Sequence, residues 1–159
     1  MTAPATTAPT TSVPRVTSAT CTPSDLSATV VDATGGAGHG EQTVELKNVT
    51  STQCVMYGYP GIGLLDPSGK MQPLNVLRAT GAGFADPAVP VTPVSLAPGA
   101  LGSFWMEWLN VNGSVGGTLE ITPPNQTTQL RVPNADIQLN VGTLTVSAVA
   151  AGVASSTQH

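Results

Sequence analysis

The stretch LGSFWMEWL, residues 101–109, indicates the fold class more clearly than any other part of the chain. Successive side chains of an extended strand point to opposite faces. Phe104, Met106 and Trp108 therefore share one face, which we expect to be the inner one because all three side chains are large and apolar. Such period-two alternation predicts a long strand that is buried on at least one side.

Shorter runs of β-branched and apolar residues fill the rest of the body, with turn signals between them. Pro60-Gly61, residues 66–69 (DPSG) and residues 97–99 (APG) each place Pro or Gly where a tight turn needs them. About eight to nine short strands separated in this way predict an all-β, antiparallel β-sandwich. A parallel sheet would need crossover helices, and Pro or Gly interrupts nearly every window long enough to form one. Residues 133–137 could form a single helical turn.

Charged side chains are scarce throughout the chain. Its 159 residues include five basic and nine acidic ones, which is 9% of the sequence, against about 25% in ordinary soluble domains. A few scattered basic residues make no electrostatic footprint for nucleic acid, and no apolar run approaches the ~18 residues of a membrane span. The surface must consist largely of Thr, Ser, Asn, Gln and Gly, so few ionisable groups remain from which to build an active site. We expect a protein that is not an enzyme.

Residues 1–20, MTAPATTAPTTSVPRVTSAT, contain too few large apolar side chains to offset the entropy of ordering. We expect them to form a disordered, extended Thr/Ala/Pro-rich linker. The stretch lacks the basic and apolar regions of a signal peptide, so we expect a mature or truncated form whose signal, lipid or membrane anchor has been removed upstream. By length, residues 21–149 form one domain, and residues 150–159 form a flexible tail.

Cys21 and Cys54 are the two cysteines of the chain. An even number of cysteines in a Thr/Pro-rich, charge-poor sequence favours a disulfide and an oxidising compartment. Closing a loop of this length would stabilise the fold by ~3–4 kcal/mol in the chain-entropy model. The alternative is a pair of buried thiols. With a disulfide, the expected location is extracellular or within the cell envelope.

Three stretches resemble a known family. Residues 42–54 (QTVELKNVTSTQC) run on into a C-x-x-YGYPG motif that begins at Cys54, residues 94–108 (VSLAPGALGSFWMEW) follow, and residues 119–133 (LEITPPNQTTQLRVP) contain the run PPNQTT. In this order they resemble the domain-of-unknown-function 4232 family of actinobacterial secreted proteins and lipoproteins. The resemblance covers most of residues 21–149, and C-x-x-YGYPG and PPNQTT are its most specific motifs.

This resemblance implies an exported, Ig-like β-sandwich near the cell envelope, with no assigned activity or cofactor, often placed behind a Thr/Ser/Pro spacer. It also implies that Cys21 and Cys54 form a pair, because they match the first cysteine pair of the family. Many members carry a second pair in the C-terminal third, and this chain has no cysteine there. The last strands must therefore be held by packing.

His39 lies in a Gly-rich run and is the histidine outside the C-terminal tail. A hydrolase would pair it with an acid and a serine, yet no G-x-S-x-G elbow surrounds any serine. We expect His39 to hydrogen-bond to backbone at the start of a strand. The Gly-rich run is not a P-loop, because Glu41 and a strand follow it instead of Lys and a helix.

A soft metal site would need two or more Met, His or Cys side chains at close spacing. Met56 lies near Cys54, but that cysteine is expected to be oxidised, and Met71 and Met106 are isolated and are expected to fill the core. The acidic residues form no Ca²⁺ loop, and Asp66 is expected to accept turn amides. We therefore expect no metal and no cofactor.

Tyr57, Tyr59 and Trp105 are the candidate binding surface. Trp105 and Glu107 share the outer face of their strand, which leaves Trp105 partly exposed if nothing covers that face. An exposed Trp with nearby Tyr can stack on sugar rings or anchor a protein contact. The alternative, which we favour, is that Trp105 packs beneath a loop such as residues 80–90.

Together these observations predict an exported, non-catalytic β-sandwich of the cell envelope that binds or assembles with an envelope protein or a glycan. We expect it to bind no nucleic acid and to have no transmembrane segment in this chain. The second hypothesis is an envelope carrier of a metal or small ligand that uses Met56, Met71 or His39. Convergence of His39 with two Met sulfurs would favour that carrier.

Overall fold

The computed structural model describes the chain from Ser18 to Gly152, except residues 37, 85, 110–113, 116, 134–137 and 140–141. These residues form strands joined by turns, with one short 3₁₀ turn, η1 (Pro23–Asp25). No helix among them is long or apolar enough to cross a membrane. The predicted all-β class is confirmed, and the helical turn expected near residues 133–137 falls largely outside the described residues.

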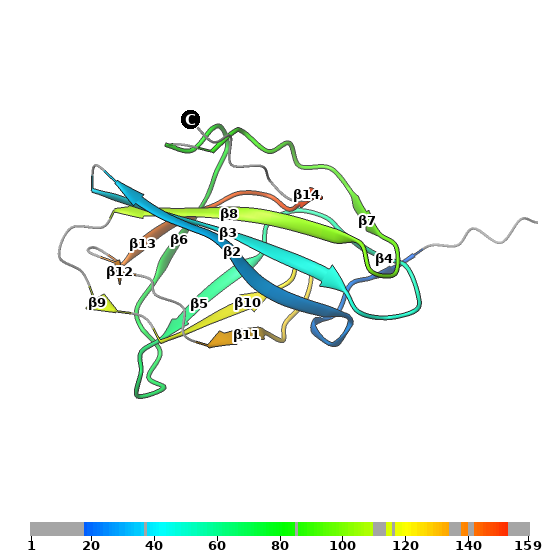
Figure 1. Cartoon of the computed structure of the whole chain (residues 1–159), viewed down its shortest axis with the longest axis horizontal. Helices are drawn as coiled ribbons and strands as arrows, with labels where there is room; N and C mark the ends of the chain where they lie inside the picture. Colours follow the sequence, from blue (N-terminus) through cyan, green and yellow to red (C-terminus); the bar gives the residue numbers. More distant parts are fainter. Residues whose placement is uncertain are drawn as a thin grey trace, which may run out of the picture.

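The larger layer is a sheet made of β2 (Leu26–Gly36), β3 (His39–Asn48), β6 (Asn75–Arg78), β8 (Leu101–Leu109), β13 (Thr143–Val146) and β14 (Ala150–Ala151). Its strand order is β2–β3–β8–β13–β6, with β14 also paired to β8 (Figure 1). The longest strands are antiparallel neighbours, because β3 pairs with β2 on one side and with β8 on the other. The centre of this layer is therefore β3 and β8.

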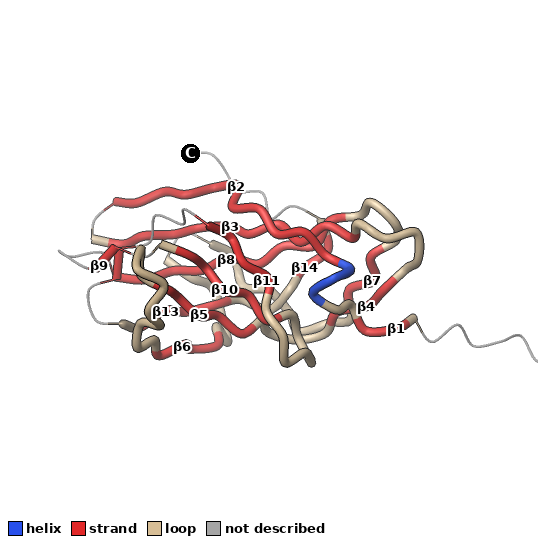
Figure 2. The backbone as a smooth tube through the Cα atoms, turned by 90° about the horizontal axis from the view of Figure 1, so that it is seen from below, coloured by secondary structure: helices blue, strands red, loops and turns tan. Residues whose placement is uncertain are grey.

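The facing layer is a three-stranded antiparallel sheet of β5 (Gly61–Leu65), β10 (Thr118–Thr122) and β11 (Leu130–Pro133). Figures 1 and 2 show this sheet lying across from β2, β3 and β8. One end of the sandwich carries a small third sheet of β1 (Ala19–Thr20), β4 (Cys54–Met56) and β7 (Val94–Leu96). At the other end, β9 (Ser114–Val115) pairs with β12 (Gln138–Leu139).

Two pairings differ from the predicted antiparallel arrangement, because β1 runs parallel to β4 and β13 runs parallel to β6. The prediction excluded a parallel sheet because no crossover helix could form, and these two pairs lie within sheets that are otherwise antiparallel. In both cases other strands of the sandwich make the connection, so no helix is needed. Of the described strands, eight have four or more residues and six are shorter. The predicted domain covers residues 21–149. β1 adds two strand residues before this range, and β14 adds two after it.

The core lies between the two layers and is centred on β8. Phe104, Met106 and Trp108 are buried on its inner side, as predicted. The Trp108 ring lies so close to Gly40 that a Cβ atom there would overlap it, which explains the glycine at this position. The other core residues include Val44, Leu46, Leu64, Leu119, Ile121, Leu144 and Val146.

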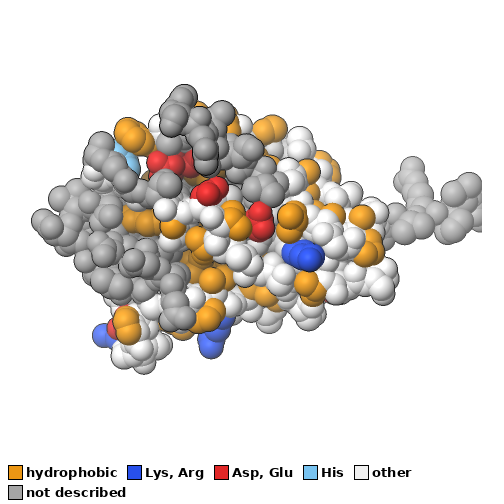
Figure 3. Space-filling view, in the orientation of Figure 1, with side chains coloured by type: hydrophobic (Ala, Val, Ile, Leu, Met, Phe, Trp, Pro, Cys, Tyr) orange, Lys and Arg blue, Asp and Glu red, His pale blue; other side chains and the backbone are white. Residues whose placement is uncertain are grey.

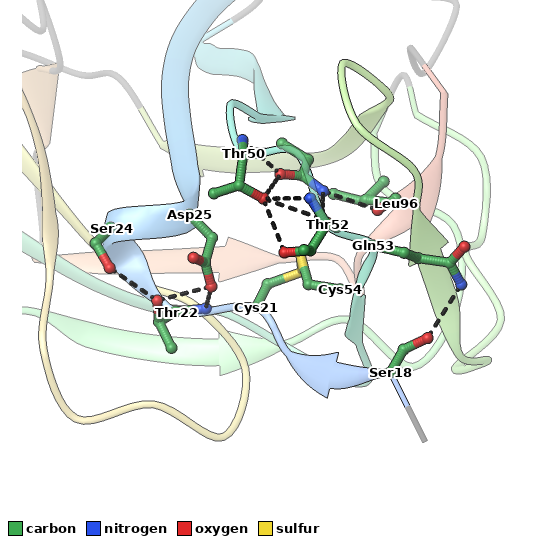
Figure 4. The surroundings of a disulfide bond; sticks show 11 residues. Ser18, Cys21, Thr22, Ser24, Asp25, Thr50, Thr52, Gln53, Cys54 and Leu96 are labelled. Atoms are coloured by element: carbon green, nitrogen blue, oxygen red, sulfur yellow. Dashed lines mark hydrogen bonds between the residues drawn. A yellow bond between two sulfur atoms is a disulfide. The ribbon is translucent and has the colours of Figure 1, made fainter. Parts of the chain in front are cut away.

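A disulfide between Cys21 and Cys54 closes the end of the sandwich that carries β1, β4 and β7 (Figure 4). Both cysteines are buried, and the Cys21 amide donates a hydrogen bond to the Val55 carbonyl at 3.0 Å. The predicted bridge is confirmed, so the alternative of two free thiols is wrong. Because it joins positions 33 residues apart, the bridge reduces the entropy of the unfolded chain.

Asn48 fastens the turn between β3 and β4 beside this disulfide. Its side-chain amide donates to the carbonyls of Thr52 (2.8 Å) and Leu96 (2.9 Å). Its side-chain oxygen accepts from the backbone amide (2.9 Å) and the hydroxyl (2.7 Å) of Thr50. Figure 4 shows Thr50, Thr52 and Leu96 gathered at this point. Asn48 is fully buried, so these bonds replace the water that it loses.

Asp66 closes the turn after β5, as predicted. Its Oδ1 accepts hydrogen bonds from the amides of Ser68 and Lys70, both at 2.9 Å, and from the Ser68 hydroxyl at 2.6 Å. The Ser68 hydroxyl, and next the Lys70 amide, lower the pKa of Asp66. Gly69 has a φ of 86°, a left-handed conformation that glycine adopts without a steric penalty.

Candidate functional site

Trp105 is fully buried, so the prediction that it is partly exposed is wrong. Its indole Nε1 donates to the Pro87 carbonyl at 3.0 Å, and its amide donates to the Ser147 hydroxyl at 3.0 Å. The alternative, packing beneath residues 80–90, is confirmed. Alternation along β8 assigns side chains to two faces, but it does not show that a loop covers the second face.

The two tyrosines have different environments. Tyr57 is 51% exposed. Tyr59 is half-buried, its hydroxyl donates to the Ala79 carbonyl at 2.8 Å, and the Arg78 guanidinium carbon lies 5.2 Å from the centre of its ring. The structure therefore does not bring Tyr57, Tyr59 and Trp105 together as one exposed aromatic surface.

The loop between β6 and β7 covers Trp105, and we call it the lid (residues 79–84 and 86–90). Figure 1 shows this loop running along the side of β8 that faces away from β5 and β10. Its first residue is attached to β13, because the Ala79 amide donates to the Val146 carbonyl at 2.9 Å. Gly and Pro occur four times in the lid, and its described residues form neither a helix nor a strand.

The middle of the lid rests on Glu107 of β8. The Phe84 amide donates to Oε2 of Glu107 at 2.7 Å, and Gly83 lies so close that a Cβ atom there would overlap the carboxylate. The Gly83 amide in turn donates to the Asp86 carbonyl at 2.8 Å, which links the two described parts of the lid. The position of the lid thus depends on a glycine at position 83 and on a carboxylate beneath it.

Three carboxyl groups meet beneath the lid, and we call Glu41, Asp86 and Glu107 the carboxyl cluster. Glu41 of β3 and Glu107 of β8 are opposite one another in register, and Asp86 joins them from the lid. Their oxygens lie within 4.8 Å of one another, and Asp86 and Glu107 are 7% and 9% exposed. Burial, then the negative charges of the two glutamates, then hydrogen bonds with both, raise the pKa of Asp86 from 3.8 to about 7.

Among the described His, Cys, Asp and Glu side chains, the carboxyl cluster is the group whose spacing would suit a cation. A hard cation such as Ca²⁺ takes about six to eight oxygen ligands. In this protein without a cation, the raised pKa of Asp86 means that the three carboxyl groups share a proton up to about pH 7. The proton-sharing state of the cluster is the one described below.

A cavity of about 440 Å³ lies between the lid and the strands β6, β8 and β13. Its walls include Leu77, Arg78, Thr80, Trp105, Glu107 and Thr145. On the same face, Phe84, Leu77 and Leu109 are exposed by 60%, 47% and 46%. The Phe84 ring is stacked on His39 with 4.0 Å between ring centroids. Figure 3 shows hydrophobic, acidic and histidine side chains close together on this side of the molecule.

A comparison with protein families places residues 21–150 in one of them, described as Domain of unknown function (DUF4232). The chain belongs to this family. The resemblance expected from the sequence motifs is thereby confirmed, and both the disulfide and the lid of this DUF4232 domain lie within the matched residues. No curated protein and no solved structure matches the chain.

The DUF4232 domain does not bring His39 and the methionines together. His39 begins β3, as predicted, and pairs with Leu109, whereas Met56 packs against Gly102 near the other end of β8. Seven residues separate these two points of β8, which is roughly 23 Å along a strand. Met71 pairs with the end of β5 in the opposite layer and is 54% exposed, so the expectation that it fills the core is wrong. These positions remove the basis for a Met/His carrier.

The sequence alone does not predict the carboxyl cluster of this DUF4232 domain. Alternation places Glu107 on the same face as Trp105, but the register of β3 against β8 is needed to set Glu41 opposite Glu107. The path of the lid is needed to add Asp86. One signal is present in the sequence, because Asp86 lies in a Gly/Pro-rich loop long enough to cross a neighbouring strand.

Proposed function

We propose that this DUF4232 domain is an exported, non-catalytic binding or assembly module of the cell envelope. The buried disulfide supports export, because such bonds form and persist in oxidising compartments. The resemblance to secreted proteins and lipoproteins of actinobacteria supports a place in the envelope. The scarcity of ionisable side chains, five basic and nine acidic among 159 residues, supports a non-catalytic role.

The observation that carries the proposal is the apolar face around this cavity. Binding sites are usually concave and mostly apolar, with a few polar groups that fix orientation. Large apolar side chains exposed close together also mark interaction surfaces. Phe84 and Leu77 fit the second description, because both are exposed beside the cavity, Phe84 on the lid and Leu77 on the strand beneath it. This face replaces the predicted surface of Tyr57, Tyr59 and Trp105.

An envelope protein fits this face better than a glycan does. Sugar recognition uses an accessible aromatic ring together with hydrogen-bonding groups. One side of the Phe84 ring is already stacked on His39, and the other exposed side chains on this face, Leu77 and Leu109, are aliphatic. An apolar segment of a partner protein would cover all three.

The test is recovery of partners from an envelope fraction with the full chain and with Phe84→Ser and Leu77→Ser. Val49→Ser is the matched control, because Val49 is 56% exposed and lies beside the disulfide end. The bound partners are cross-linked before they are identified. We expect the wild type and Val49→Ser to recover the same protein, with its cross-links on the lid. Both test variants should lose it. The proposal fails if all four proteins recover the same partners, or if the control loses them.

A small ligand is the second candidate, and the size of the cavity favours it. Small-molecule sites usually have volumes of about 300–1,000 Å³, and the cavity has about 440 Å³. This candidate keeps the small-ligand carrier of the second sequence hypothesis, but it does not use Met or His side chains to hold the ligand. Native mass spectrometry should show an added mass on the wild type that is absent from Thr145→Trp, in which the new side chain fills the cavity. Equal masses of added ligand on both proteins would exclude it.

A further inference from the structure

The carboxyl cluster joins the lid to the centre of the larger sheet. Glu41 and Glu107 are fixed opposite each other on β3 and β8, which pair along nine residues. Asp86 belongs to the lid, whose described residues form no helix or strand. Separating the two glutamates would break the centre of the larger sheet. If repulsion within the cluster rises, the lid is therefore the part that can move.

We propose that the lid is a pH-sensitive cover of the outer face of β8, closed while the carboxyl cluster holds a shared proton and more readily opened once that proton is lost. In the closed position, Oε2 of Glu107 accepts a hydrogen bond from the Phe84 amide of the lid. The closed position also needs an uncharged Asp86, because the three carboxyl groups lie within 4.8 Å of one another in a mostly buried space. Loss of the proton brings like charges together there.

Other ionisable groups near the cluster come from the elements packed beneath the lid. β3 contributes His39, which lies under the lid, and β2 contributes Asp32, which pairs with the outer edge of β3. β6 contributes Arg78, whose guanidinium lies over the ring of Tyr59. Histidine side chains change charge between pH 5 and 8 in many proteins. The test must therefore separate His39 from Asp86.

The direction of the pH effect follows from the number of bound protons. The pKa of Asp86 is about 7 with the lid closed, against 3.8 for an ordinary carboxyl group. Between these values the closed lid binds more protons than the open one, so closing is most favourable at acid pH. Opening becomes easier as the pH rises to about 7, by up to about tenfold per pH unit, and then levels off because both states are ionised.

The consequence for binding rests on the proposed function. The lid forms one wall of the cavity, and its Phe84 belongs to the exposed apolar face. Opening would enlarge the cavity and release Phe84 from His39, so a partner would reach this face more easily above about pH 7. The movement itself does not require a partner.

The indole N–H of Trp105 is the reporter, because Pro87 of the lid accepts its hydrogen bond. Its hydrogen exchange, measured by NMR and corrected for the intrinsic effect of pH, should show an opening equilibrium that rises about tenfold or more between pH 5 and pH 7. In Asp86→Asn the corrected exchange should not depend on pH, whereas His39→Gln should keep the wild-type dependence. A flat wild type, an unchanged Asp86→Asn or a flat His39→Gln would each overturn the proposal.

A second measurement needs no variant. The side-chain carboxyl carbon of Asp86 in the wild-type chain, followed by NMR, should titrate with a midpoint of about 7. A midpoint near the ordinary value of 3.8 would overturn the proposal. Both NMR experiments use the protein alone, whereas partner recovery is done at one pH. Failure of the pH-sensitive lid can therefore be told from failure of the proposed function.

Discussion

The two ends of β3 lie in regions that are built differently. At its C-terminal end, a buried disulfide joins Cys21 to Cys54, and Asn48 makes four hydrogen bonds with well-placed partners. At its N-terminal end, the carboxyl cluster shares a small space, a cavity of about 440 Å³ remains, and large apolar side chains are exposed. The disulfide region thus contributes most to the stability of the fold, whereas the lid region is where we expect the conformation to change.

The contrast arises from side-chain partners and not from the backbone. β3 is paired on both sides along most of its length, so its own hydrogen bonds are similar in the two regions. Polar groups at the disulfide end meet complementary groups, whereas the acids under the lid meet like charges. On the inner side of the lid end, the Gln42 Oε1 and Trp108 Nε1 atoms are buried and have no hydrogen-bond partner among the described residues. The predictions below test this difference, from the largest effect to the smallest.

Removing the disulfide should have the largest effect. We expect the double variant Cys21→Ser, Cys54→Ser to lose ~3–4 kcal/mol of unfolding free energy, because its unfolded chain regains the entropy of an open loop. Urea denaturation measures this loss. The pH dependence of Trp105 indole exchange should persist in the folded fraction, because the lid lies at the other end of β3. A loss of less than about 1 kcal/mol would show that the disulfide end is held by packing alone.

Asn48→Ala should be the next most costly change. It leaves the buried carbonyl of Leu96 and the amide of Thr50 without their partner, so we expect a loss of about 2–3 kcal/mol in urea denaturation. Gln53→Ala is the control, because its amide bonds to Ser18 at the surface; it should change stability by less than about 0.5 kcal/mol. Similar losses in both variants would contradict the special role of Asn48.

Gly83→Ala should loosen the lid and reduce the stability of the whole fold less than the two changes above. The new Cβ overlaps the Glu107 carboxylate, and displacing this flexible side-chain end should reduce stability by about 1 kcal/mol. Trp105 indole exchange should already be fast at acid pH. Gly81→Ala is the matched control, because nothing lies within 4 Å of a Cβ atom there. If Gly81→Ala loosens the lid as much, the contact with Glu107 is not what positions it.

Gln42→Met should have the smallest effect and the opposite sign. The change removes a buried acceptor that has no partner and keeps a side chain of similar length, so we expect a gain of up to about 1 kcal/mol in urea denaturation. Asn48→Leu, a polar-to-apolar change at a site with all its bonds made, is the comparison and should be destabilising. A loss of stability in Gln42→Met would mean that Oε1 is bonded to water in solution.

Features that depend on short sequence patterns were predictable, and features that depend on how distant segments meet were not. Alternation along residues 101–109 predicts β8 and its inner face, and the DPSG stretch predicts the turn that Asp66 closes. The register that sets Glu41 opposite Glu107 is a property of two strands, and neither strand encodes it alone. The cover over Trp105 depends in the same way on the path of the lid.

The most direct test compares two backbone amides of the full chain by hydrogen exchange at pH 5 and pH 8. The Phe84 amide is bonded to Glu107 under the lid, and the Cys21 amide is bonded to Val55 beside the disulfide. After correction for the intrinsic effect of pH, we predict that Phe84 exchanges at least about tenfold faster at pH 8 and that Cys21 does not change. An equal change at both amides, or none at Phe84, would contradict the division of the sandwich into a stable end and a pH-sensitive one.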